Sequence, residues 1–279
     1  MEDRIDIGID GGGTGCRLAL SYRGEVREYH GGPANIVTDP AGAEAAIRLV
    51  LDEALADAGL SFADMPRARV CAGLAGARLP GEADTFATRL PYIAYVVDDS
   101  VTALEGALDG AEGTLVSLGT GSFFIRKTAD DLRHLGGWGF QLGDEGSAAW
   151  LGKRALTLTL MVVDGRLPPD PLADTLMAEA TPHPVRFART ASPNDFAQLA
   201  RVVLTHLETP LGRRLLDETL AILRGGLVAL DHQKGAPWVL TGGLGDLLAP
   251  HLPDDLGEGR LPPKGRPVDG ALRLAKALP

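Results

Sequence analysis

The sequence contains one short pattern twice: an apolar segment, a turn of glycines and a threonine, and a second apolar segment. The first copy covers residues 5–22 with its turn at 10–15, and the second covers 114–127 with its turn at 119–122. Alternating apolar side chains predict strands, so each copy is expected to be a strand, a glycine turn and a returning strand. An internal duplication explains the match. The alternative is a chance likeness between two unrelated glycine hairpins.

The pattern divides the chain into two expected domains of an α/β protein, 1–110 and 111–279. The last helix, at about 268–278, is a candidate for packing back on the N-terminal domain. In the first domain we expect strands and helices at 25–29, 40–58, 69–72, 81–90, 92–97 and 100–110. In the second we expect helices and one strand at 144–163, 171–180, 195–206, 210–233, 238–240 and 268–278, with a loose loop at 254–266.

Charge and cysteine content exclude several classes of protein. The chain carries 27 Lys and Arg against 37 Asp and Glu, a net charge of −10, which disfavours nucleic acid and anionic membranes as partners. Two cysteines without CxxC spacing indicate neither a disulfide framework nor a zinc site. The longest nearly apolar stretch, 155–163, is too short to span a membrane, and no signal-like segment opens the chain. We therefore expect a cytoplasmic protein.

The glycine clusters do not match the commonest nucleotide-binding motifs. The nearest approach to a P-loop, 146–153, has five residues between its glycines and continues with Arg154. The turn at 10–15 lacks the sixth-position glycine of a dinucleotide fingerprint and leads into a strand instead of a helix. Zinc-protease and serine-hydrolase motifs are also missing from the sequence.

The two turns nevertheless suit phosphate groups. Consecutive glycine N–H groups can face phosphate oxygens without interference from side chains, and Thr14 and Thr120 add hydroxyl donors. Asp10, at the entrance of the first turn, can hold Mg²⁺, which prefers a carboxylate together with phosphate oxygens. Each turn alone is more simply a plain hairpin. The pair, with its acidic neighbour, favours a triphosphate site.

Four segments together are similar to a known group of proteins. They are DGGGT from Asp10, GTGS from Gly119, GGWGFQLGDEGS from Gly136, and TGGL from Thr241. In this order they resemble the superfamily of sugar kinases, heat-shock proteins and actin. More narrowly they resemble the N-acetylglucosamine kinase and glucosamine kinase group of the BadF/BadG/BcrA/BcrD ATPase family. The resemblance covers nearly the whole chain, and the segment from Gly136 is its most specific part.

This resemblance implies two actin-like, ribonuclease H-like domains flanking an ATP cleft, and it implies ATP and Mg²⁺ as cofactors. It places the nucleotide at three groups of residues, with the metal at Asp10 directly or through water. The nucleotide-binding residues it implies are Asp10, Gly12, Gly13, Thr14, Gly119, Thr120, Gly121, Gly242 and Gly243. From the sequence alone, the last two glycines are equally well explained as a helix-entry turn after a buried strand.

The same resemblance implies that Asp99 is the catalytic base for a sugar 6-hydroxyl, while the neighbouring Asp98 caps the following helix. The alternative is that both aspartates only serve the helix start. The sugar ligands it implies are Asn35, Asp99, Thr120, Trp138 and Asp144. Two of these have plainer explanations: Trp138 as core packing, and Asp144 with Glu145 as acidic residues at the start of a helix.

The resemblance thus implies a hexosamine kinase that transfers the ATP γ-phosphate to the 6-hydroxyl of N-acetylglucosamine or glucosamine. Small-molecule partners are expected, and because the family is often dimeric a homodimer is allowed. One alternative is an ATPase that acts on a protein partner. The reductase-activating ATPases of the family bind an iron–sulfur cluster through interface cysteines, and Cys16 and Cys71 lie in predicted hairpin and strand positions that do not suit that role. A further alternative is a non-catalytic sugar sensor.

Overall fold

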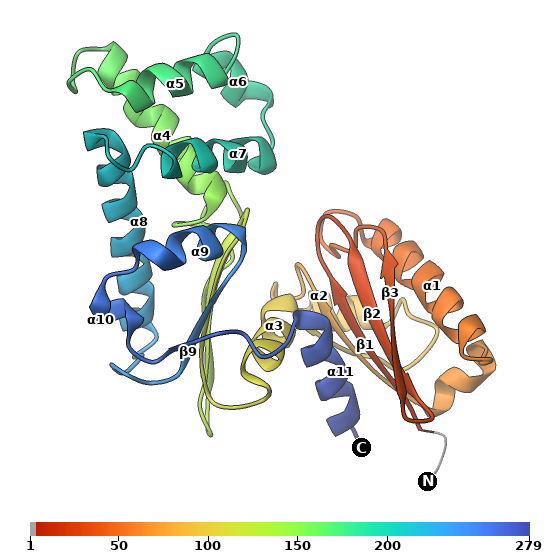
Figure 1. The fold of residues 1–279 in the computed structure, drawn as a ribbon. Helices are drawn as coiled ribbons and strands as arrows, with labels where there is room; N and C mark the ends of the chain where they lie inside the picture. The colour runs from red at the N-terminus through yellow and green to blue at the C-terminus, as the bar shows by residue number, and fades with distance from the viewer. Residues whose placement is uncertain (1–3) are drawn as a thin grey trace. The chain divides into compact units, whose positions relative to one another are not determined.

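The computed structural model describes residues 4–279 and divides into two compact units, each described by itself below (Figure 1). The first unit comprises the chain up to Ala111 together with Pro263–Pro279, and the second is Glu112–Pro262. The chain therefore crosses between the units twice. In both units a five-stranded sheet carries helices, which gives the α/β class expected from the sequence.

The sheet of the first unit has the order β3-β2-β1-β4-β5. Its strands are β1 (Ile5–Gly11), β2 (Cys16–Tyr22), β3 (Glu25–Gly31), β4 (Ala68–Leu74) and β5 (Tyr95–Asp98). The first three strands are antiparallel hairpins, whereas β4 is parallel to β1 and β5 is parallel to β4. The carboxyl ends of β1, β4 and β5 therefore meet at one edge of the sheet.

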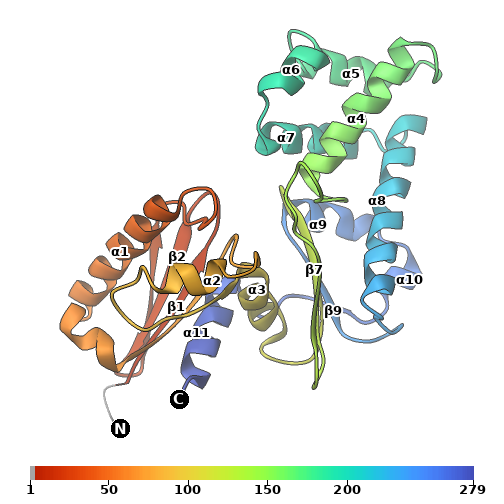
Figure 2. The same cartoon turned by 180° about the vertical axis from the view of Figure 1, so that it is seen from behind.

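Helices cover both faces of this sheet (Figure 2). They are α1 (Pro40–Asp57), the 3₁₀ helix η1 (Phe62–Arg67), α2 (Glu82–Ala87), α3 (Asp99–Leu108) and α11 (Pro267–Ala277). Because side chains alternate along a strand, Ile5, Ile7 and Ile9 pack into the core on the α1 face. Gly8 lies on the opposite face, where α11 packs against β1 and α3.

The contacts of α11 depend on glycines. A Cβ atom added to Gly8 of β1 would lie 2.2 Å from the backbone nitrogen of Leu272, and one added to Gly270 would lie 2.0 Å from the carbonyl oxygen of Thr102 in α3. Both distances are far shorter than any van der Waals contact. The backbones of β1, α3 and α11 can approach this closely only because no side chain stands between them.

The sheet of the second unit has the order β10-β9-β6-β7-β8. Its strands are β6 (Gly113–Leu118), β7 (Ser122–Lys127), β8 (Leu132–Gly136), β9 (Trp238–Thr241) and β10 (Arg260–Leu261). Read from β8 to β10, it repeats the first sheet in both order and strand direction. The repeated topology supports the internal duplication predicted from the two glycine turns. The strand β8 was not predicted from the sequence.

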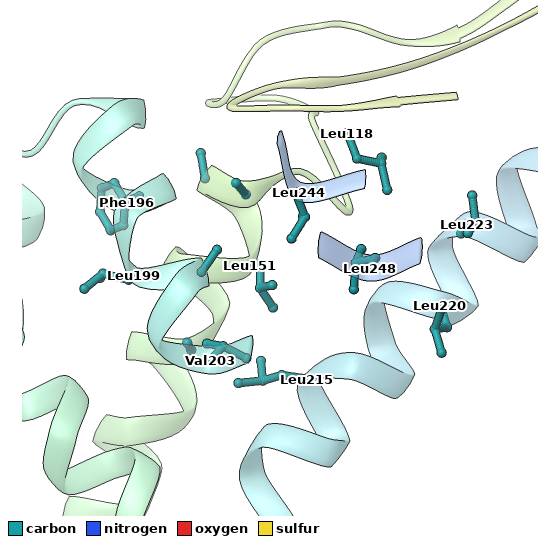
Figure 3. Close-up of a cluster of buried hydrophobic side chains, with 14 of the residues drawn as sticks. Leu118, Leu151, Phe196, Leu199, Val203, Leu215, Leu220, Leu223, Leu244 and Leu248 are labelled. Carbon is teal, nitrogen blue, oxygen red and sulfur yellow. The ribbon is translucent and has the colours of Figure 1, made fainter. Parts of the chain in front are cut away.

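The second unit is otherwise helical. Its helices are α4 (Ala148–Val163), α5 (Pro171–Glu179), α6 (Pro184–Thr190), α7 (Pro193–Leu204), α8 (Pro210–Ala229), α9 (Gly243–Leu248), η2 (Ala249–His251) and α10 (Asp254–Gly257). Leucines and other apolar side chains of α4, α7, α8 and α9 pack together and onto Leu118 of β6 (Figure 3). This core fixes the positions of α7 and α9 relative to the turn that follows β6.

Proline marks the start of many helices in both units. The helices α1, α5, α6, α7, α8 and α11 all have proline in their first turn, where its missing N–H costs nothing. Side chains of Asp39, Asp170, Ser192 and Thr209 cap four of them by accepting a backbone N–H. These start signals explain why most helices are where the sequence predicts them.

Two predicted elements were wrong. The helix expected from residue 144 begins at Ala148, because the side chain of Ser147 accepts the N–H of Trp150 and caps it. The loop expected at 254–266 contains α10 and β10, and the latter extends the second sheet beside β9. Among residues 4–279, no helix is both long and apolar enough to cross a membrane.

Candidate functional site

The first glycine turn joins β1 to β2 at the edge where the parallel strands end. Its backbone is closed by a hydrogen bond of 3.0 Å from the N–H of Gly12 to the carbonyl of Gly15. Gly13 and Thr14 at its tip are exposed, and a Cβ added to Gly13 would meet nothing within 4 Å. The turn thus presents open backbone and one hydroxyl group to a ligand.

Asp10 stands at the entrance of this turn on the α11 face of the sheet. Burial raises the pKa of its carboxyl to about 6, and the positive charge of Arg17 opposes that shift. The Arg17 guanidinium is 3.9 Å from the carboxylate, whose side chain remains 18% exposed. A partly buried carboxylate with one distant cationic partner is a suitable ligand for a metal ion.

Asp98 and Asp99 join β5 to α3 and have different surroundings. The Asp98 carboxylate accepts the N–H of Ser100 at 3.2 Å and also its hydroxyl, so Asp98 is the N-cap predicted from the sequence. Asp99 is the first residue of α3 and is partly buried. Burial, and then the negative charges of Asp98 and Asp10, raise the pKa of Asp99 to about 7.

The strand register explains why Asp10 and Asp99 act on each other. In the parallel part of the sheet, Leu74 of β4 lies opposite both Gly11 of β1 and Asp98 of β5. The residues next to these partners, Asp10 and Asp99, therefore lie at the same edge of the sheet. Each carboxylate is held in a site that disfavours its ionised form, a common property of functional carboxyl groups.

Asn35 lies close to the same turn, because the N–H of Ala34 donates to the carbonyl of Gly12 at 2.8 Å. The side-chain oxygen of Asn35 accepts the backbone N–H groups of Val37 and Thr38, each at 3.0 Å. These two bonds fix the orientation of the side-chain amide, so its NH₂ group points away from the N–H groups of Val37 and Thr38. The amide nitrogen is thus a fixed donor that remains available to a ligand.

In the second unit, the turn after β6 and the segment 136–147 are held together by Asp144. A hydrogen bond of 2.9 Å from the N–H of Gly119 to the carbonyl of Gly121 closes the turn. Thr120 is exposed at its tip. Backbone groups of Ser122 and Gly139 hydrogen bond to the Asp144 carboxylate, which is 8% exposed and whose pKa burial raises.

The structure overturns one explanation for Asp144 and one for Trp138. Asp144 has φ of 61° in a turn before α4, so it does not begin that helix. Its carboxylate connects the turn to the segment 136–147 instead. Trp138 is 56% exposed, so core packing does not account for it.

The two glycines after β9 differ in their surroundings. Gly242 has φ of 90°, and a Cβ placed on it would lie 2.4 Å from the carbonyl oxygen of Leu118, so the backbone there requires glycine. It is the N-cap of α9, which agrees with the helix-entry turn considered above. Gly243 instead lines a cavity of about 180 Å³.

That cavity lies within the second unit, between the turn after β6, α7 and α9. Its lining residues are Gly119, Thr120, Ala148, Asn194, Ala197, Gln198, Ala200, Arg201, Gly243, Leu244 and Leu247. The α7 residues of this set were not predicted from the sequence. The signal that could have found them is the amphipathic period of α7, which leaves Asn194, Gln198 and Arg201 on one exposed face.

The candidate residues thus form groups within each unit. Asp10, Gly12, Gly13, Thr14, Asn35 and Asp99 belong to the first unit, and Gly119, Thr120, Gly121, Trp138, Asp144, Gly242 and Gly243 belong to the second. Within residues 4–279, no group of three or more His, Cys, Asp or Glu side chains is arranged to hold a metal ion.

Comparison with known proteins adds an independent line of argument. A glucosamine kinase, GspK, from Vibrio cholerae is 32% identical over 96% of this chain and 95% of its own length. An N-acetylmuramic acid/N-acetylglucosamine kinase from Clostridium acetobutylicum is 31% identical over 57% of this chain and 55% of its own. The crystal structure of a Chromobacterium violaceum protein, provisionally assigned as an N-acetylglucosamine kinase, superposes with a TM-score of 0.86 at 33% identity. That match covers 98% of this chain and 99% of the other.

The family model of the BadF/BadG/BcrA/BcrD ATPases matches residues 7–244, which include both glycine turns and both groups of candidate residues. The Vibrio cholerae kinase extends the likeness to nearly the full length of both chains. The chain therefore belongs to the BadF/BadG/BcrA/BcrD ATPase family.

Proposed function

We propose that the protein is an ATP-dependent amino-sugar kinase, which transfers the γ-phosphate of ATP to the 6-hydroxyl of N-acetylglucosamine or glucosamine. The observation that carries the proposal is the pair of carboxyls at one sheet edge: Asp99, with its pKa raised to about 7, beside Asp10. The similarity to a glucosamine kinase over nearly the whole chain supports the choice of acceptor.

Asp99 is the base in this proposal. Its carboxylate accepts the proton of the sugar 6-hydroxyl, the hydroxyl oxygen bonds to the γ-phosphorus, and the bond from that phosphorus to the β-γ bridging oxygen breaks to release ADP. A base is most effective when its pKa lies near the working pH, because it is then ionised and still basic. Burial and neighbouring charge give Asp99 such a pKa.

The nucleotide contacts follow from the exposed turns. We assign phosphate binding to Gly12, Gly13 and Thr14, and to Gly119, Thr120 and Gly121. Asp10 suits Mg²⁺, because a nearby cation relieves the cost of ionising a carboxyl whose pKa burial raises. Magnesium bound with ATP would neutralise phosphate charge. One carboxylate is sufficient for such an ion, since phosphate oxygens and water supply the remaining ligands.

The sugar contacts are proposed from polar groups with spare hydrogen-bonding capacity. Asn35 offers its amide N–H₂, and Asp144 retains acceptor positions beyond the two backbone groups that it binds. The exposed ring of Trp138 offers an apolar surface for a sugar face. Hydroxyl-rich ligands are recognised by such fixed donors and acceptors.

We expect Asn35→Asp to separate the binding role of Asn35 from its structural role. An aspartate still accepts the two backbone N–H groups, so the turn should keep its stability, but it cannot donate to a sugar hydroxyl. The KM for the sugar should rise by roughly tenfold or more, and the thermal midpoint should move little. Steady-state kinetics and thermal melting measure the two effects. Asn35→Ala is the comparison: it should raise the KM for the sugar and also lower the thermal midpoint, because alanine cannot accept the two backbone N–H groups. A sugar KM unchanged in Asn35→Asp removes Asn35 from the sugar site.

The proposed function is tested by a coupled ADP-release assay with Mg·ATP and a panel of sugars. The panel contains glucosamine, N-acetylglucosamine, N-acetylmannosamine, N-acetylmuramic acid and glucose. We expect one or two amino sugars to stimulate ADP release strongly, with a phosphorylated sugar detected by mass spectrometry. Hydrolysis of ATP that no sugar accelerates would instead indicate an ATPase acting on a protein partner. Sugar binding without turnover would indicate a sensor.

A further inference from the structure

A second cavity of the second unit, of about 270 Å³, lies between α4 and the segment 136–147. We call it the α4 cavity. One wall is a single face of α4, where Trp150, Lys153, Arg154 and Thr157 stand at positions i, i+3, i+4 and i+7 of the helix. The other lining residues are 140–143 and Glu145. None of the contacts proposed above uses this cavity.

The α4 cavity adjoins the residues proposed to bind the sugar. Its lining residue Gly143 lies directly against Trp138, since a Cβ added to Gly143 would be 3.1 Å from the Cβ of Trp138. Burial raises the pKa of Asp144, and the negative charge of Glu145 adds to that shift, so these two carboxyls lie close together. A sugar held by Trp138 and Asp144 therefore has the cavity beside it, and a substituent on the sugar ring can extend into the cavity.

Of the two cations that line the α4 cavity, one is already paired. Arg154 donates to both carboxylate oxygens of Glu218 in α8, at 2.7 and 2.9 Å. Lys153 has no carboxylate partner among residues 4–279, and its ammonium lies 4.9 Å from the centre of the Phe140 ring. Glu145 lines the same cavity without forming an ion pair with Lys153. Lys153 is thus the cation that is free to bind an anionic group.

The support beneath Lys153 is rigid. The opposite face of α4 is buried in the core of the second unit, where Leu151 lies among leucines of neighbouring helices (Figure 3). The Phe140 ring is held by Phe196 of α7, with 5.1 Å between the ring centres. A cation kept over a fixed ring loses little freedom when it binds a carboxylate. Leu142 also lines the cavity and is 86% exposed, which gives the carbon atoms of a ligand an apolar surface.

We propose that the α4 cavity admits a carboxylate-bearing substituent of the sugar and that Lys153 binds its carboxylate. The acceptors then include hexosamines that carry a carboxyalkyl ether on the ring. This rests on the proposed function, because it needs the sugar at Trp138 and Asp144. A cavity of about 270 Å³ approaches the size of small-ligand pockets and admits a three-carbon acid. A fixed ammonium and a carboxylate form a charge-assisted hydrogen bond.

The test compares three sugars that differ only at the oxygen of carbon 3. They are N-acetylglucosamine, N-acetylmuramic acid with its three-carbon acid, and the methyl ester of that acid, which has the size without the charge. The parent protein should have a lower KM and a lower calorimetric Kd for the acid than for its ester. In Lys153→Gln both constants should rise roughly three- to tenfold for the acid and stay unchanged for the other two sugars.

Two further variants examine the charge in the cavity. Lys153→Arg keeps the positive charge and should retain most of the affinity for the acid. Glu145→Gln removes the negative charge that lines the same cavity, so it should tighten binding of the acid. The matched control is Lys234→Gln, outside the cavity lining, where Lys234 pairs with Glu258; it should leave all three sugars unaffected. Thermal melting reports whether each variant folds.

The proposal is overturned if the parent binds the acid no better than its ester, or if Lys153→Gln weakens the acid and N-acetylglucosamine equally. If the parent phosphorylates only sugars with a free amine, then glucosamine, muramic acid and its methyl ester form the same series. Failure of the proposed function is distinct from these outcomes, because the parent would then phosphorylate no amino sugar at all.

Discussion

Replacing Asp99 with asparagine should lower kcat for sugar phosphorylation by roughly 10²- to 10⁴-fold, the usual contribution of a general base. Asparagine has nearly the same shape as aspartate but cannot accept a proton at neutral pH. The rate of the chemical step should therefore fall, while the binding of both substrates is kept. The Kd for Mg·ATP should stay close to that of the parent or fall slightly, because one negative charge is removed near the phosphates. Single-turnover kinetics and calorimetry measure the two quantities separately.

The same variant should be at least as heat-stable as the parent at pH 8. The pKa of Asp99 is raised from 3.8 to about 7, so the folded state holds this proton more tightly than the unfolded state does. The stability that the protonated Asp99 carboxyl contributes is present in full below pH 3.8, the pKa of the unfolded state. It is lost as the pH rises through about 7, the pKa of the folded state. An uncharged asparagine does not incur this loss. A lower melting temperature at pH 8 would mean that a structural defect, and not the missing base, explains low activity.

Asp98→Asn is the matched control for Asp99→Asn. Asparagine is as good an N-cap as aspartate, so α3 should begin where it does now. Removing the charge of Asp98 also removes one of the causes that raise the pKa of Asp99. The variant should remain active, and the acidic limb of its profile of kcat/KM against pH should move to lower pH. If Asp98→Asn is as inactive as Asp99→Asn, the base cannot be assigned to Asp99.

Much of the first unit could be predicted from the sequence because its signals are local. Three such signals act on their own neighbours in the chain: the apolar alternation of residues 5–9, the cap at Asp39 and Pro40, and the adjacent Asp98 and Asp99. The cap assigned to Asp98 was confirmed in its hydrogen bonds to Ser100. The repeated glycine turn predicted an internal duplication, and the matching strand orders of the two sheets support it.

Other features depend on contacts between distant residues, and the sequence gives no local sign of them. Asp144 was expected at a helix start, yet its carboxylate bonds backbone groups of Ser122 and Gly139 in other segments. The cavity wall on α7 is a functional candidate only because the core brings it opposite Gly243. The double hydrogen bond that fixes Asn35 also depends on a loop conformation that periodicity does not describe.

Gly270→Ala should lower the free energy of unfolding of the first unit by about 3 kcal/mol. This is the upper end of the usual cost of overpacking a core. The new methyl group would lie 2.0 Å from the carbonyl oxygen of Thr102 and 2.4 Å from the nitrogen of Gly106, both backbone atoms of α3 that cannot rotate away. To admit it, α11 must move off α3. The backbone of Leu272 in α11 also packs closely on Gly8 of β1, where an added Cβ would lie 2.2 Å from the Leu272 nitrogen. The same movement would therefore also disturb the contact of α11 with the sheet.

Gly225→Ala in α8 makes the same chemical change in an open position, where an added Cβ meets nothing within 4 Å. It should stabilise the protein by roughly 0.5–1 kcal/mol, the ordinary gain from alanine in a helix. Thermal and urea melts should therefore move in opposite directions for the two variants. Because Asp99 is the first residue of α3, the displacement caused by Gly270→Ala should also lower kcat, whereas Gly225→Ala should not. Equal melting temperatures for the two variants would show that α3 and α11 are not packed backbone to backbone.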